Sequence, residues 1–182
     1  LAQVQRALGK TGAARANLVL ASKLNPDESI AWGTLASMAL EQNRLAPARQ
    51  YIGSALEVEP ENTLWRLVEA RIERRDNKPE KALDILLAMD KRTILQDPSI
   101  VKEIALCYGL MGEPGTAAQW YVESANANDE NPELMYEAAR WLERSGQTRR
   151  AIDYAHNATL LGHEGAETLL TRLEESRASA DG

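Results

Sequence analysis

Few side chains in this sequence are of the types that catalyse reactions or bind metal ions. Its 182 residues include two histidines, His156 and His163, and a single cysteine. The stretch His-Glu-Gly-Ala-Glu at His163 begins like the zinc-binding pattern His-Glu-x-x-His but lacks the second histidine. Because His163 follows a predicted helix, we expect it to interact with the last free carbonyl groups of that helix. The sequence therefore predicts no catalytic residue, no metal site and no cofactor.

Other patterns that support chemistry are also missing from the sequence. There is no glycine-rich phosphate loop and no calcium-loop spacing. Cys107 lies in a predicted helix without a histidine nearby, so we expect a small buried side chain. A single cysteine excludes an internal disulfide framework. An Asn-x-Thr sequon at Asn157 falls inside a predicted helix and is a weak match.

Charge and hydropathy exclude further classes of function. Lys and Arg number 21 and Asp and Glu number 27, which gives a net charge of −6 and argues against general nucleic-acid binding. No apolar run approaches the roughly 18 residues that would span a bilayer. The sequence begins inside a predicted helix without Met or a signal-peptide pattern. We expect more protein upstream, and the compartment, cytoplasm or bacterial periplasm, stays open.

Small residues recur along the chain in three columns, each with a regular period of about 34 residues. The first column, of turn-forming residues, is Gly9, Asn43, Asn77, Gly112 and Gly146. The other two, of alanines, are Ala14, Ala48, Ala82, Ala117 and Ala151, and Ala2, Ala36, Ala70, Ala105 and Ala139. Amphipathic stretches flank each turn residue, so the pattern predicts repeated helix pairs. Alanines at the crossings would let the paired helices approach closely.

The second repeat carries a recognisable pattern of residues. Trp32, Leu35, Ala48, Ala55 and Pro60 resemble the consensus of the tetratricopeptide repeat (TPR) family, which has the same period. Pro60 ends one helix pair, and the following Asn62 is expected to cap the next helix. The resemblance covers residues 1–165 and implies an all-α fold, a right-handed α-solenoid of antiparallel helix pairs.

The register predicts about five TPR units and a capping helix. The units are residues 1–28 (partial), 29–62, 63–97, 98–131 and 132–165, followed by a capping helix and tail at 166–182. Leu169, Leu170 and Leu173 should form the apolar side of the capping helix. The third unit lacks the closing proline, so its second helix should run on or end irregularly within residues 90–98.

The TPR resemblance implies a concave groove, built from the first helix of each pair, that binds a peptide or partner helix. The inward-facing positions are Gly33, Ser37, Leu40, Leu67, Arg71, Arg74, Lys102, Leu106, Gly109, Tyr136, Arg140 and Glu143. This set is apolar with a basic middle, so we expect an acidic and partly apolar partner. The alternative is that the arginines only solubilise a helix face. The asparagines of the chaperone-tail clamp are absent, so binding of that kind is not expected.

The sequence thus predicts a non-catalytic scaffold that binds another protein. By analogy, it would act in bacterial secretion, pilus assembly or exopolysaccharide export. Two alternatives stay open: a docking or regulatory module of a larger enzyme, and a self-association module that forms a homo-oligomer. Trp32 is expected in the core. The other tryptophans, which could pack internally or mark an interface, are Trp65, Trp120 and Trp141.

Overall fold

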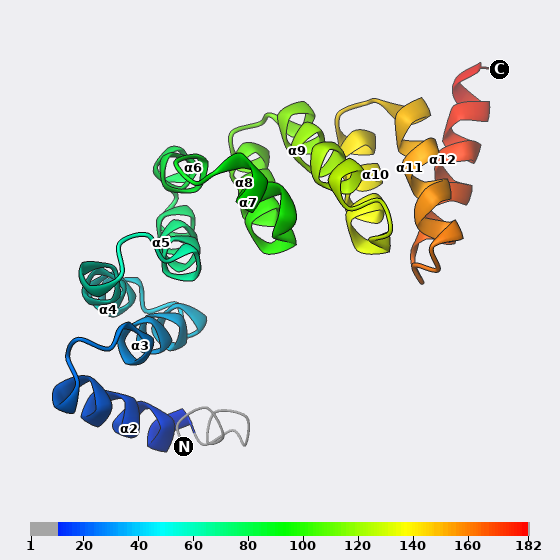
Figure 1. Ribbon diagram of the computed structural model, residues 1–182. Coiled ribbons are helices and arrows are strands. Elements are labelled where there is room, and N and C mark those ends of the chain that lie inside the picture. The colour runs from blue at the N-terminus through cyan, green and yellow to red at the C-terminus, as the bar shows by residue number, and fades with distance from the viewer. Residues whose placement is uncertain (1–10, 182) are drawn as a thin grey trace. The chain divides into compact units, whose positions relative to one another are not determined.

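The computed structural model describes residues 11–181, which are helical with short connections and contain no strand in that range (Figure 1). The helices are α2 (Thr11–Leu24), α3 (Ser29–Glu41), α4 (Leu45–Val58), α5 (Thr63–Arg75), α6 (Pro79–Leu87), α7 (Lys91–Gln96), α8 (Pro98–Leu110), α9 (Pro114–Ala127), α10 (Pro132–Arg144), α11 (Thr148–Leu160) and α12 (Ala166–Asp181). The all-α prediction is confirmed. The predicted Gly9 turn and Ala2 lie outside the described residues.

The chain forms two compact units, one ending at Leu86 and the other beginning at Leu87. In the first unit, α3 packs against α2 and α4, and α5 packs against both α3 and α4. In the second unit, each of α8 to α11 packs against the next helix along the chain. The division between the units falls inside the predicted third repeat.

The turn residues of the repeat adopt the left-handed conformation within the described range. Asn43 and Asn77 have φ of 55° and 58°, and two glycines of the same column also have positive φ. At the first of these turns, the backbone N–H of Arg44 donates to the carbonyl of Ala39, and that of Asn43 to the carbonyl of Leu40. These two bonds form the Schellman motif that ends a helix. The predicted turns are therefore confirmed at every described position.

We expect Asn43→Ala to lower the free energy of unfolding by about 1 kcal/mol, because alanine tolerates the left-handed region poorly. Asn43→Gly is the matched control and should keep or slightly raise stability, since glycine adopts positive φ without a steric cost. Urea unfolding followed by circular dichroism measures both. Equal stability of the two variants would show that this turn does not depend on its backbone angle.

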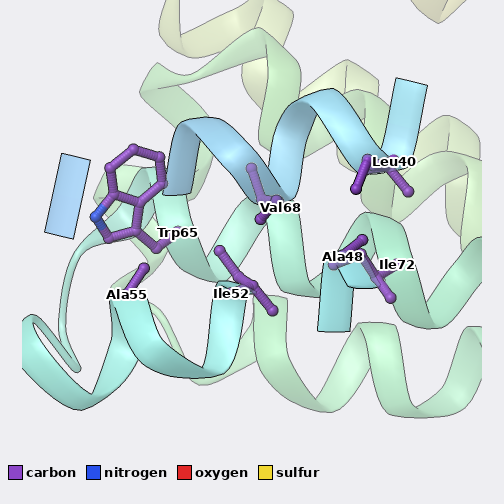
Figure 2. Close-up of a cluster of buried hydrophobic side chains, with 9 residues drawn as sticks. Leu40, Ala48, Ile52, Ala55, Trp65, Val68 and Ile72 are labelled. Carbon is purple, nitrogen blue, oxygen red and sulfur yellow. The ribbon is translucent and has the colours of Figure 1, made fainter. Parts of the chain in front are cut away.

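The alanine columns lie in the core, as predicted. Every described member is fully buried: Ala14, Ala36, Ala48, Ala70, Ala82, Ala105, Ala117, Ala139 and Ala151. Figure 2 shows one such region, where Ala48 and Ile52 of α4 lie close to Val68 and Ile72 of α5. The large side chains fill the space beside the alanines, so neighbouring helices share one layer of buried residues.

The third predicted repeat departs from the expectation. Its second helix, α6, ends at Leu87, before the range 90–98, and a separate short helix, α7, follows. The Asp90 side chain starts α7 by accepting hydrogen bonds from the backbone N–H groups of Arg92 (2.9 Å) and Thr93 (3.2 Å). The Ser124 hydroxyl on α9 donates to the carbonyl of Leu95 at 2.8 Å. These capping and docking bonds stabilise the additional helix.

The last helix and the tryptophans show how the remaining apolar side chains are used. On α12, which packs against α11, Leu169 and Leu173 are buried, as predicted for a capping helix, and Leu170 is partly buried. Trp65 and Trp141 are buried core residues. Trp32, predicted in the core, is partly buried and packs against the buried core residues of the first unit, while its indole N–H donates to the carbonyl of Pro26 at 3.0 Å.

Candidate functional site

The predicted groove residues lie on the first helices, α3, α5, α8 and α10, but they differ in exposure. Three of them, Gly33, Leu40 and Leu67, are buried. Buried residues cannot present a side chain to a partner, so their assignment to the groove is wrong. The others keep exposed surface: Ser37, Arg71, Arg74, Lys102, Leu106, Gly109, Tyr136, Arg140 and Glu143.

The burial of Gly33 has a specific cause in the next first helix. The Trp65 ring of α5 lies directly on this glycine, and a Cβ atom placed there would be 2.3 Å from the ring. The Trp65 indole N–H donates to the Ser29 hydroxyl at 3.0 Å, which fixes the ring. The same contact recurs between Gly109 and Trp141. In both pairs the tryptophan follows the glycine by the same number of residues. This repeated spacing could have revealed the contact from the sequence.

The face of the first unit combines exposed apolar residues with arginines. Ile30 and Leu64, which were not among the predicted groove residues, are 53% and 54% exposed. Each is the second residue of its helix. At the other end of α5, Arg71 and Arg74 are partly exposed, and Arg75 donates to the carbonyl of Leu40 at 2.6 Å. The structure thus places exposed apolar side chains at the start of α3 and α5 and partly exposed arginines at the end of α5.

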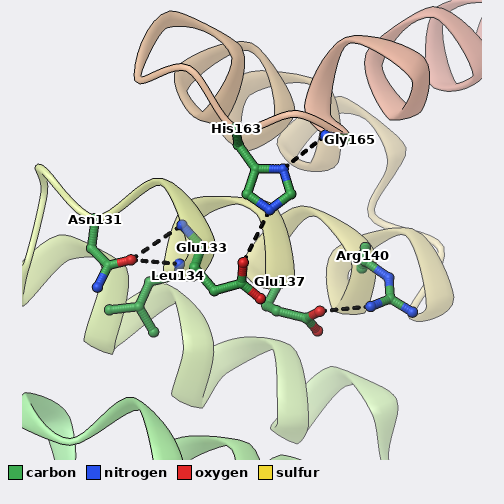
Figure 3. Close-up of polar contacts among 7 residues, drawn as sticks. All are labelled: Asn131, Glu133, Leu134, Glu137, Arg140, His163 and Gly165. Atoms are coloured by element: carbon green, nitrogen blue, oxygen red, sulfur yellow. Dashed lines mark hydrogen bonds and ion pairs between the residues drawn. The ribbon is translucent and has the colours of Figure 1, made fainter.

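The face of the second unit carries a cluster of aromatic and charged side chains, and Figure 3 shows the polar contacts of its charged members and of His163. The rings of Tyr136 and His163 stack with centroids 4.0 Å apart. The backbone N–H of Gly165 donates to His163 Nδ1 at 3.1 Å, so in the neutral ring the proton is on Nε2. His163 Nε2 then donates to the Glu133 carboxylate at 3.0 Å. The sequence predicted that His163 interacts with the last carbonyls of its helix, and its backbone N–H does donate to the carbonyl of Ala158 at 3.0 Å. The sequence did not predict the contacts of its ring with Gly165 and Glu133.

Arg140 extends this cluster along α10. Its guanidinium lies 5.7 Å from the centre of the Tyr136 ring and donates to the Glu137 carboxylate at 2.6 Å. Burial opposes the charge of Arg140, but the attraction of Glu137 outweighs burial and raises the pKa of the guanidinium. The guanidinium of Arg140 is therefore already paired with a carboxylate of the same helix, that of Glu137. The face of the second unit combines both charges with aromatic surface.

Comparison with solved structures decides the fold. PilF of Pseudomonas aeruginosa matches with a TM-score of 0.79 and 19% identity over 99% of this chain and 82% of PilF. PilW, described as a type IV pilus biogenesis factor, matches with a TM-score of 0.71 and 20% identity over 96% and 88% of the two chains. YrrB, a TPR protein with an unusual peptide-binding site, matches with a TM-score of 0.66, 14% identity and the same two coverages.

This chain has the tetratricopeptide-repeat fold. No protein-family model and no curated protein matches the sequence. At these sequence identities the structural likeness establishes the TPR fold alone. The function of the fold in this protein therefore has to be argued from the side chains of this chain.

The TPR helices of the described range hold no group of three or more side chains that could bind a metal ion. No helix in that range is long and apolar enough to cross a membrane. His156 is exposed on α11, the second helix of its pair.

A cavity of about 440 Å³ lies on α11 and α12, outside the faces of the first TPR helices. It is lined by Gly146, Gln147, Thr148, Arg149, Arg150, Ser176 and Arg177. Among the residues that the structure describes, this lining contains no histidine, cysteine or carboxylate that could act as a base beside its hydroxyl groups.

Proposed function

We propose that this protein is a non-catalytic scaffold that binds a segment of another protein on the faces of its first TPR helices. The cluster of Tyr136, His163, Glu133 and Arg140 carries the proposal. These side chains are held in place by stacking and hydrogen bonds, although they contribute little to the buried core. A partner that binds them would meet a surface already ordered, which keeps the entropic cost of binding small.

The assembly in which such a scaffold would act is suggested by its structural relatives. PilW is described as a type IV pilus biogenesis factor, and PilF and PilW both match this chain over nearly its whole length. We therefore propose a role in assembling a bacterial surface fibre, with secretion and exopolysaccharide export as related settings. The partner would be a protein component of that machinery.

Photo-crosslinking in the source cells tests the scaffold proposal. A photoreactive phenylalanine analogue would replace Tyr136 on α10 or, as a matched control, Tyr154 on α11. We expect a discrete crosslinked protein from position 136 and at least a fivefold weaker product from position 154. Equal products from the two positions, or none from position 136, would contradict binding at the first helices.

A further inference from the structure

The cavity on α11 and α12 is lined by three arginines that come from two helices. Arg149 and Arg150 belong to the first turn of α11, and Arg177 belongs to the second half of α12. The two helices pack against each other within the second unit, so the cavity is formed by one compact unit. Its volume of about 440 Å³ falls within the range of roughly 300–1,000 Å³ that is usual for small-molecule sites.

No carboxylate neutralises the arginines of this cavity. None of the three forms an ion pair with a residue that the structure describes. Arg150 donates instead to the uncharged amide oxygen of Gln147 at 2.5 Å. By contrast, Arg172, on the same helix as Arg177, is paired with Glu143 at 2.9 Å. The cavity therefore concentrates positive charge in a chain whose net charge is −6.

Acidic side chains one turn away on the same helices do not line the cavity. Asp153 follows Arg149 by four residues, and Glu174 precedes Arg177 by three, which are spacings at which side chains on a helix can meet. In the described part of the chain neither acid forms an ion pair with these arginines. The guanidinium groups are therefore available to an anionic ligand.

The side chains of the lining favour a phosphate group among the possible anions. A guanidinium donates two parallel hydrogen bonds to the oxygen atoms of phosphate or carboxylate. Thr148 and Ser176 add hydroxyl groups to the same lining. A phosphate monoester carries about −1.5 to −2 charges at pH 7, so it matches three clustered cations better than a carboxylate with a single charge.

The rest of the lining indicates what the phosphate would be attached to. Besides the arginines and Gly146, the described lining consists of the amide of Gln147 and the hydroxyls of Thr148 and Ser176. These groups can hydrogen-bond to hydroxyl groups of a ligand. The described lining has no aromatic ring on which a nucleobase could stack and no large apolar side chain that could cover an acyl chain. The body of the ligand is therefore expected to be polar and rich in hydroxyl groups.

We propose that this cavity binds a sugar phosphate or another phosphorylated polyol. Guanidinium groups of both helices would hold the phosphate, and the amide and hydroxyl groups of the lining would hold the polyol. The same chemistry occurs in a free metabolite and in the headgroup of a phospholipid. Binding here does not require a partner on the first TPR helices, because the lining lies on α11, α12 and the connection before α11.

Calorimetry of the full chain at low ionic strength tests the proposal with glucose 6-phosphate, glucose and inorganic phosphate. We expect glucose 6-phosphate to bind at least tenfold more tightly than glucose and at least threefold more tightly than inorganic phosphate. Added NaCl should weaken its binding, because salt screens exposed charges. Equal binding of glucose and glucose 6-phosphate would overturn the phosphate assignment, and equal binding of inorganic phosphate would overturn the polyol assignment.

Sedimentation with vesicles distinguishes a lipid headgroup from a free ligand. The vesicles are phosphatidylcholine with either phosphatidylglycerol, whose headgroup is a phosphorylated polyol, or phosphatidylserine as the control of equal charge. More sedimentation with phosphatidylglycerol identifies a lipid source, whereas equal sedimentation excludes it and leaves the free sugar phosphate. If neither glucose 6-phosphate nor phosphatidylglycerol is preferred over its control, the proposal is overturned.

A pair of double variants tests the role of the arginines. Arg149→Gln with Arg177→Gln removes one guanidinium from each helix and should weaken binding at least tenfold. Arg44→Gln with Arg92→Gln removes the same charge from exposed positions outside the cavity, and its binding should stay within twofold. Equal loss in the two double variants would show that net charge, and not this cavity, attracts the ligand.

A second pair of variants tests the cavity itself. Ser176→Trp places a large side chain in the lining while it keeps all three arginines, and it should also weaken binding at least tenfold. Ser179→Trp makes the same change at an exposed position of α12 outside the lining and should bind normally. Unchanged binding by Ser176→Trp would overturn the assignment of the cavity.

The outcomes are distinguishable from those of the scaffold proposal. All substituted residues are exposed, so thermal melting should show that the variants remain folded. Crosslinking from position 136 should be the same in the cavity variants as in the parent chain. Loss of phosphate binding with retained crosslinking therefore concerns this cavity alone.

Discussion

Replacing Gly33 by alanine lowers the free energy of unfolding of the first unit by about 1–3 kcal/mol, the usual cost of overpacking. An alanine Cβ would lie 2.3–2.5 Å from three atoms of the Trp65 ring. That ring is buried and its N–H is bonded to Ser29, so it cannot move away without losing contacts. The loss occurs even though alanine favours a helix over glycine by about 1 kcal/mol.

Gly53→Ala is the control for this experiment. Gly53 lies within α4, and a Cβ there would meet no atom within 4 Å, so alanine should raise stability by about 0.5–1 kcal/mol. Urea unfolding measured by circular dichroism compares the two variants. A Gly33→Ala variant as stable as Gly53→Ala would mean that Trp65 does not hold the position described here.

The repeat register was predictable because helix packing restricts particular positions. Alanines that allow close crossings and residues that adopt positive φ have few substitutes, so they recur once in every repeat and are visible in the sequence. Asn62 was predictable for a similar reason: its side chain accepts from the backbone N–H groups of Leu64 and Trp65, as its type and position indicate.

Contacts between large side chains of different helices were harder to predict from the sequence. Helical periodicity places Leu67 on the inner face of α5. Whether Leu67 is buried depends on which side chains of the neighbouring helices pack against it. The stacking of Tyr136 on His163 joins α10 to the connection before α12, and no periodic pattern marks such a pair. The pairing of Arg140 with Glu137 could have been predicted, since residues three apart are neighbours on a helix.

Replacing Ala117 by arginine destabilises the second unit by roughly 4 kcal/mol or more, because it combines overpacking with an unpaired buried charge. Ala117 is fully buried on α9, which packs against both α8 and α10. A long side chain at this position must displace one of those helices or carry its guanidinium into an apolar layer. We expect the second unit to lose its cooperative thermal transition.

Ala127→Arg provides the matched control, since it adds the same side chain to the same helix. Ala127 is the exposed last residue of α9, where a cation is favourable to the helix dipole and the change in stability should stay within about 0.5 kcal/mol. Thermal melting by circular dichroism compares the two variants. In a repeat protein each helix contacts mainly its neighbours, so the damage should be concentrated in the second unit. If Ala117→Arg and Ala127→Arg melted alike, buried alanines could not be what lets these helices pack closely.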